Sequence, residues 1–129
     1  MKAICLKGWV FSGMGEGEKY VGLAWVKEQI EQKLGFAPYA GTLNIRLDDQ
    51  SKLKKNLLIK GSSFEMVPSA GHCGGRLYKA ILNGGAEAAV VVPEVPDYPE
   101  NVVEVVSSEN LRKKLMLKDG DAVDVRIIL

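Results

Sequence analysis

Residues 8–44 read GWVFSGMGEGEKYVGLAWVKEQIEQKLGFAPYAGTLN, and this stretch organises the rest of the chain. A short apolar segment ends at Ser12, a glycine-rich turn follows over Gly13–Gly17, and an amphipathic helix comes next. A second turn, Pro38–Asn44, carries a hydroxyl and an amide residue close together. A strand, a glycine turn, a helix and a return strand would bring the two turns to one rim of the fold.

The turn over Gly13–Gly17 has glycine at three of its five positions. Glycine has no Cβ, so several backbone N–H groups of such a turn can approach an anion. The turn is neither a P-loop, which needs a following Gly-Lys-Ser/Thr, nor a dinucleotide-binding fingerprint. By itself it leaves a structural turn and a phosphate site equally open. Its place before a helix favours the phosphate site, because helix N-termini attract anions.

The segment Tyr20–Leu34 is predicted to be that helix. Apolar residues at helical spacing would form one buried face, and they are Leu23, Val26, Ile30 and Leu34. Gly35 is typical of a helix C-terminus, and Pro38 disfavours a restart of the helix.

The segment Gly41–Leu47 alternates apolar and polar residues, which predicts a half-buried strand. Its apolar residues, Leu43, Ile45 and Leu47, would face the core. Thr42 and Asn44 would then point to the other side together, because side chains two apart in a strand share a face. They are either ordinary strand residues or two neutral oxygen ligands for one ion. Magnesium accepts such ligands when phosphates supply the charge.

The rest of the chain contains more short strands and little regular alternation of strands with helices. Ser108 is a candidate N-cap for a short helix over Glu109–Leu115, and the polar part of Asp48–Lys60 is expected to be a loop. An all-β fold is therefore predicted: a small six-stranded closed barrel with one medium and one short helix on its rim. The further strands are expected at Ala3–Ser12, Phe64–Val67, Gly75–Asn83, Ala86–Pro93, Val102–Val106 and Ala122–Leu129, with a hairpin turn at Asn83–Gly85.

Composition narrows the class of protein. The length of 129 residues predicts a single domain over residues 1–129. The formal net charge of +1 gives no electrostatic reason to expect nucleic acid or a membrane as the main partner. Two cysteines without metal-site spacing favour free thiols in a reducing compartment. No signal-like or membrane-spanning segment is visible, so a cytoplasmic protein is expected. It is also expected to be a monomer.

Several isolated residues have both a structural and a chemical interpretation. Glu104, between valines, is either a solvent-facing strand residue or a carboxylate that binds a hydroxyl or acts as a general base. Arg112 is a surface charge or a phosphate or base contact, and Tyr98 suits a flat ligand as well as a loop anchor. His72, next to Cys73, has no visible third partner, so it is interpreted as a loop residue.

Together these segments resemble the archaeal CTP-dependent riboflavin kinases. The resemblance runs through G-x-V-x-SG-x-GEG at Gly8–Gly17 and LGF-x-PY-x-GTLN at Leu34–Asn44. It continues in the remaining motifs in order, and only Asp48–Gly75 matches loosely. These further motifs are Val91-Val92-Pro93, Glu104-Val105, Leu111-Arg112 and Leu117–Asp121.

This resemblance implies a six-stranded cradle-loop barrel and transfer of the γ-phosphoryl group of CTP to the ribityl 5′-hydroxyl of riboflavin, giving FMN and CDP. It implies magnesium at Thr42 and Asn44, and flavin contacts at Glu104, the tentative base, and at Pro96. At Pro96 the family has a hydroxyl residue, so here only a backbone contact is expected. The implied nucleotide-binding residues are Met14, Gly15, Glu16, Gly17, Glu18, Lys19, Glu109, Asn110, Leu111 and Arg112.

Two other functions fit parts of the sequence. A non-catalytic flavin- or nucleotide-binding barrel would use the same sites without turnover. A DNA-binding barrel related to swapped-hairpin transcription factors is disfavoured by the near-zero net charge and the lack of a basic stripe.

Overall fold

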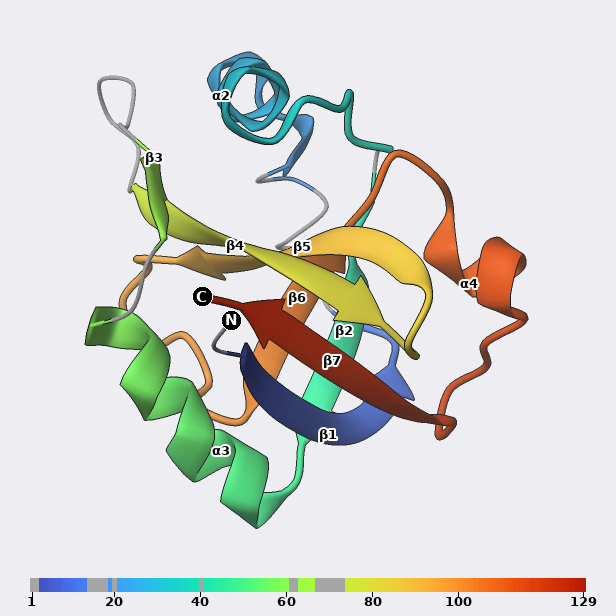
Figure 1. Ribbon diagram of the computed structural model, residues 1–129. Helices are drawn as coiled ribbons and strands as arrows, with labels where there is room; N and C mark the ends of the chain where they lie inside the picture. Colours follow the sequence, from blue (N-terminus) through green and yellow to red (C-terminus); the bar gives the residue numbers. More distant parts are fainter. Residues whose placement is uncertain (1–2, 14–18, 20, 40, 61–62, 67–73) are drawn as a thin grey trace.

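A computed structural model describes residues 3–13, 19, 21–39, 41–60, 63–66 and 74–129 (Figure 1). Its core is a β-barrel with short helices around it. The strands are β1 (Ala3–Phe11), β2 (Leu43–Leu47), β3 (Phe64–Met66), β4 (Gly75–Leu82), β5 (Ala86–Pro93), β6 (Val102–Val106) and β7 (Ala122–Ile128). The helices are α2 (Ala24–Leu34), α3 (Asp49–Lys55), the 3₁₀-helix η1 (Asn56–Lys60) and α4 (Leu111–Leu115).

The sheet closes on itself. Its strand order is β3-β4-β5-β6-β2-β1-β7, and β7 pairs in turn with β4. Six strands therefore form a closed antiparallel barrel, and β3 is added outside it as an edge strand on β4. The predicted fold class is confirmed. Closure removes the free edges that an open sheet of these strands would expose.

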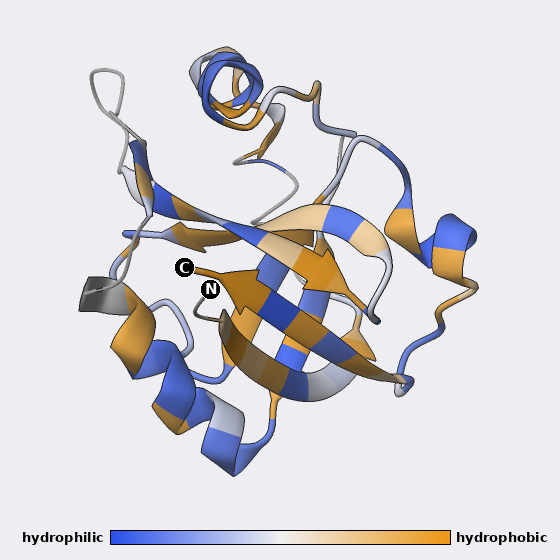
Figure 2. Ribbon diagram, in the orientation of Figure 1, coloured by the Kyte–Doolittle hydropathy of each residue, from blue (hydrophilic) through white to orange (hydrophobic). Residues whose placement is uncertain are grey.

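The hydropathy pattern explains which strands are half-buried and which are fully buried. In β7 the buried residues Val123, Val125 and Ile127 alternate with exposed polar ones, which is visible as alternating colours in Figure 2. In β5 the apolar run is continuous, because both of its faces are covered. Ala88 and Val90 point into the barrel core.

Helix α2 covers the outer face of the strands opposite the barrel interior (Figure 1). Val26 and Ile30, two of the four residues predicted to form its apolar face, are fully buried there. They pack with the outward residues Leu77, Ala89, Val91 and Val106 of β4, β5 and β6. This second core is why Ala86–Pro93 has no polar face along most of its length.

Two helix boundaries differ from the predictions. The α2 helix begins at Ala24, because Leu23 has an extended backbone (φ −68°, ψ 135°) that separates it from the helical residues Val21 and Gly22. The α4 helix begins at Leu111, and its N-cap is Asn110, which accepts a hydrogen bond from Lys113 N at 3.3 Å. The prediction of Ser108 as N-cap was wrong, since Asn110 offers the same capping chemistry two residues later.

The prediction of a loop after β2 was also wrong, because residues 49–55 form α3. The Asp48 side chain caps this helix by accepting a hydrogen bond from Ser51 N at 2.8 Å. That contact lowers the pKa of Asp48. Ser51, which is buried, accepts a hydrogen bond from Lys7 N at 2.7 Å and so ties α3 to β1.

Two other groups of predictions, the bounds of two strands and a hairpin turn, are confirmed. The strands β5 and β6 have the predicted bounds, and the hairpin turn at Asn83–Gly85 has positive φ at Asn83 (49°) and Gly84 (75°). Left-handed backbone at both positions is what Asn-Gly favours in hairpins. Within the described residues, no helix is long and apolar enough to cross a membrane.

Candidate functional site

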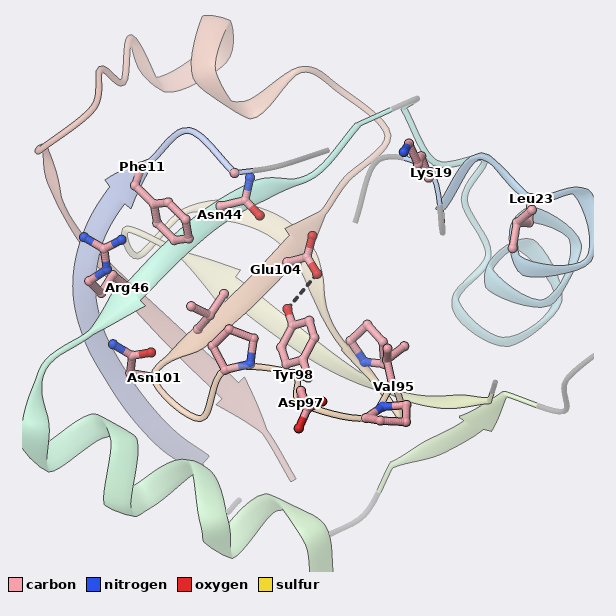
Figure 3. Close-up of a pocket in the computed structure, with 15 residues that line it drawn as sticks. Phe11, Lys19, Leu23, Asn44, Arg46, Val95, Asp97, Tyr98, Asn101 and Glu104 are labelled. Atoms are coloured by element: carbon pink, nitrogen blue, oxygen red, sulfur yellow. Dashed lines mark hydrogen bonds between the residues drawn. The ribbon is translucent and has the colours of Figure 1, made fainter. Parts of the chain in front are cut away.

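A large cavity of about 700 Å³ opens beside β2 and β6 (Figure 3). The proline-rich segment between β5 and β6 forms much of its wall, so the lining is mainly apolar with a few polar groups. Such a surface suits a flat, largely apolar ligand that is oriented at a few points. The lining residues are Phe11, Gly13, Lys19, Leu23, Asn44, Arg46, Pro93, Val95, Pro96, Asp97, Tyr98, Pro99, Asn101, Val102 and Glu104.

Glu104 is a buried carboxylate with three neutral donors. It lies opposite Asn44 in the β2–β6 register and is 3% exposed. Thr42 Oγ1 donates to its Oε1 at 2.9 Å. The Tyr98 hydroxyl donates to its Oε2 at 2.6 Å, which is the dashed line in Figure 3. With the Asn44 amide oriented to suit its neighbours, its nitrogen also donates to Oε1, at 3.2 Å. These hydrogen bonds offset part of the cost of burying a carboxylate.

The phenol of Tyr98 is a permanent donor to this carboxylate. Burial, together with the hydrogen bond to Glu104 and the charge of that carboxylate, raises the pKa of Tyr98 far above its usual range. The hydroxyl therefore stays protonated at any ordinary pH. Of the two interpretations of Tyr98, the loop anchor describes this contact, although the ring also lines the cavity.

Gly13, the first residue of the glycine turn, packs directly on Asn44. A Cβ at Gly13 would lie 2.5 Å from the end of the Asn44 amide group, and Gly13 N donates to the reoriented amide oxygen at 3.2 Å. The start of the first turn and the Thr42–Asn44 pair therefore do meet at one rim. The rest of the predicted nucleotide turn, Met14–Glu18, lies outside the described residues, as do His72 and Cys73.

A smaller cavity of about 180 Å³ lies on the other side of Thr42. It brings together the predicted residues Glu109–Arg112 and Thr42, with Tyr39 on its edge. Asn110 Nδ2 donates to the Tyr39 hydroxyl at 3.2 Å. Because Thr42 lines this cavity, Asn44 lines the larger one and both donate to Glu104, the three side chains separate two neighbouring cavities.

Arg112 is held in place beside the smaller cavity. Its guanidinium donates to Asp119 Oδ1 at 2.7 Å and to Phe11 O at 3.2 Å. Asp119 also accepts a hydrogen bond from Ser12 Oγ at 2.8 Å. The hydrogen bonds from Arg112 and then Ser12 lower the pKa of Asp119. These contacts fasten α4 to the end of β1, immediately before the glycine turn.

The predicted site residues thus divide into two groups. Pro96, Glu104, Asn44 and Lys19 line the larger cavity, and Thr42 and Glu109–Arg112 line the smaller one. Lys19 therefore does not share a cavity with the other predicted nucleotide contacts that the structure describes. Arg46 and Phe11, whose guanidinium and ring stack at 4.7 Å, were not predicted as site residues, although the alternation along β2 placed Arg46 on the same face as Asn44.

The site thus belongs to a small closed antiparallel barrel with two cavities, one lined by the buried carboxylate Glu104 and the other by its hydrogen-bond partner Thr42. Sequence comparison defines the family. The model named CTP-dep_RFKase, with the description "Domain of unknown function DUF120", matches residues 10–127, so the chain belongs to this family.

Curated relatives carry the name "Riboflavin kinase". The protein from Archaeoglobus fulgidus is 42% identical over 133 residues, which cover 98% of this chain and 55% of the relative. The one from Saccharolobus solfataricus is 39% identical, covering 98% and 75%. The one from Sulfurisphaera tokodaii is 34% identical, covering 99% and 98%. This chain thus spans little more than half of the first relative and nearly all of the last.

Proposed function

We propose that this chain is a CTP-dependent riboflavin kinase that transfers the γ-phosphoryl group of CTP to the ribityl 5′-hydroxyl of riboflavin, giving FMN and CDP. The observation that carries the proposal is the position of Glu104, buried between an apolar cavity and a smaller polar one. The family match and the name of the relatives support the same activity.

In this proposal the larger cavity takes the flavin and the smaller one takes part of the nucleotide. The ribityl chain would then lead toward Glu104, where the two ligands meet. The 5′-hydroxyl oxygen attacks the γ-phosphorus while the bond from that phosphorus to the β,γ-bridging oxygen breaks. Glu104 accepts the hydroxyl proton, and CDP leaves. Phosphoryl transfer depends mainly on alignment and charge stabilisation, which two adjoining cavities supply.

Thr42 and Asn44 are the residues that would hold a magnesium ion. The Thr42 hydroxyl gives its hydrogen to Glu104, so its lone pairs remain for a cation. The Asn44 amide nitrogen faces Glu104 as well, which leaves its oxygen as the group on the side of Gly13. Neutral oxygens of this kind fit magnesium that also binds phosphate. A bound ion would neutralise charge on the phosphates.

An assay of FMN formation tests the activity. The protein would be mixed with riboflavin, magnesium and either CTP or ATP, and FMN would be separated by chromatography and detected by its fluorescence. FMN is expected with CTP. Its absence would exclude the kinase and leave a non-catalytic binding barrel, and activity with ATP alone would exclude CTP as the donor.

Replacing Thr42 or Asn44 with alanine should weaken the use of magnesium. Loss of one ligand oxygen is expected to raise the magnesium concentration for half-maximal activity by about 10-fold, which corresponds to about 1.4 kcal/mol. Titration calorimetry of magnesium into the complex with CDP gives a second readout. The matched control is Thr42→Ser, which keeps the hydroxyl. An unchanged magnesium dependence in both alanine variants would refute their role as ligands.

Replacing Arg112 with methionine should raise the KM for CTP by about 10-fold or more, since hydrogen bonds from a charged donor contribute about 1.5–3 kcal/mol. The KM for riboflavin should change little, because Arg112 lines the smaller cavity and not the larger one. Lys113→Met, on an exposed position of the same helix, is the control. Equal changes in both KM values would argue against a nucleotide contact.

A further inference from the structure

Helix α3 contacts the wall of the larger cavity through one side chain. Lys55, the last residue of this helix, donates from Nζ to Val102 O at 2.8 Å. Pro99 O and Glu100 O lie at 3.4 Å from the same ammonium, which is long for a hydrogen bond. An ammonium has three donors. These three oxygens are backbone carbonyls of residues 99–102, at the end of the segment that joins β5 to β6 and the start of β6.

The same ammonium also contacts Tyr98. Nζ of Lys55 lies 5.3 Å from the centroid of the Tyr98 ring, within the range of a cation–π interaction. At its other end, the Tyr98 hydroxyl donates to Glu104 Oε2 at 2.6 Å (Figure 3). A continuous set of contacts therefore leads from α3 through Tyr98 to the carboxylate between the two cavities.

Burial distinguishes Lys55 from its neighbour Lys54. Burial lowers the pKa of Lys55, and the charges of Glu100 and Glu104 oppose that shift. Lys54, its neighbour, is exposed, and its Nζ lies 3.5 Å from Cys5 O, which is long for a hydrogen bond. Partly desolvating an ammonium costs free energy unless it is paired, and here the carbonyl groups, the ring and a nearby carboxylate provide that pairing.

We propose that Lys55 is a positioning residue for the flavin-binding half of the site. It holds the segment 95–102, which forms the wall of the larger cavity, and it fixes Tyr98 so that its phenol meets Glu104. Lys55 is not among the residues that line the cavity. The effect expected on the KM for riboflavin rests on the proposed function. The effect expected on amide hydrogen exchange rests on the geometry alone.

The variant Lys55→Met removes the ammonium and keeps an unbranched side chain, and Lys54→Met is the matched control. In Lys55→Met the KM for riboflavin should rise by about 10-fold, while the KM for CTP stays within about twofold. Amide hydrogen exchange of residues 94–102 should become at least about 10-fold faster, and exchange in β4 and β7 should stay as in the wild type. Lys54→Met should change none of these quantities.

A second variant, Tyr98→Phe, tests the other end of the contacts. It removes the phenol and keeps the ring beside Lys55. Because both residues act through one set of contacts, the double variant should be clearly less impaired than the product of the two single effects. This comparison, made by hydrogen exchange as well as by kinetics, also stands if Lys55→Met proves less stable.

The outcomes separate the two proposals. A wild-type protein that makes no FMN overturns the kinase, while the hydrogen-exchange comparison still tests the role of Lys55. Unchanged exchange in residues 94–102 of Lys55→Met would overturn the positioning role. Equally fast exchange over the whole barrel would overturn it too, because Lys55 would then support only overall stability. Independent effects of Lys55→Met and Tyr98→Phe would contradict a shared set of contacts.

Discussion

Replacing Glu104 with glutamine should lower the kcat for riboflavin phosphorylation by about 100-fold, the lower range for the loss of a general base. Glutamine has nearly the same volume, so the side chain still fits between the two cavities. Its neutral amide cannot take the proton of the attacking hydroxyl. Thermal unfolding, followed alongside, should show a folded protein, because the substitution also removes a buried charge.

The hydrogen-bond partners of Glu104 sharpen this test. Tyr98 and Thr42 are hydroxyl residues that can rotate to accept from the new amide as well as donate to its oxygen. A fall in kcat therefore cannot be attributed to an unpaired buried donor. Glu87→Gln, at an exposed position on β5, is the matched control and should retain full activity. A rise in the KM for riboflavin with an unchanged kcat would mean that Glu104 only binds the substrate.

The barrel could be predicted because the alternation of apolar and polar residues within each strand shows which of its faces is buried. Alternating residues such as Val123, Val125 and Ile127 specify which face of a strand is buried, and closure follows from burying one face of six short strands. The prediction that Thr42 and Asn44 lie on one face of their strand also follows from the two-residue period of a β-strand. Both turn toward the same carboxylate in the structure.

Helix α3 was missed because its burial does not follow a helical period. Leu53 is 68% exposed, while the buried residue on this helix is Ser51, so apolar spacing gives no signal. The N-cap at Asp48 was the available sign. Since Lys55 ends this helix, its contacts with the proline-rich segment could not be anticipated either.

The centre of the site depends on an irregular segment. Tyr98 reaches Glu104 from the irregular segment 94–101 between β5 and β6, and no periodicity predicts the path of that segment. The sequence therefore identifies the carboxylate as a candidate, but not the donors that surround it. Contacts made by irregular segments are the part of a functional site that pattern analysis reaches least well.

Replacing Gly8 with alanine should destabilise the barrel by about 3 kcal/mol, the upper range for an overpacked core position. Gly8 pairs with Leu47 on one side and with Val123 on the other, so β1 is held between β2 and β7 at this point. A Cβ there would lie 2.2 Å from Arg46 O and 2.8 Å from Ile45 Cγ2. The nearest of these atoms belongs to the backbone, so a change of rotamer cannot relieve the clash.

Urea unfolding measures this effect as a lower midpoint with an unchanged m-value. The control is Gly22→Ala, where an added Cβ has no neighbour within 4 Å and a change of no more than about 0.5 kcal/mol is expected. A Gly8→Ala protein as stable as the wild type would mean that β1 and β2 can separate at little cost. Because β1 leads to Gly13, which packs on Asn44, such freedom would also leave the rim of the site loosely held. The close approach of the two strands at Gly8 therefore links the stability of the barrel to the geometry of the site.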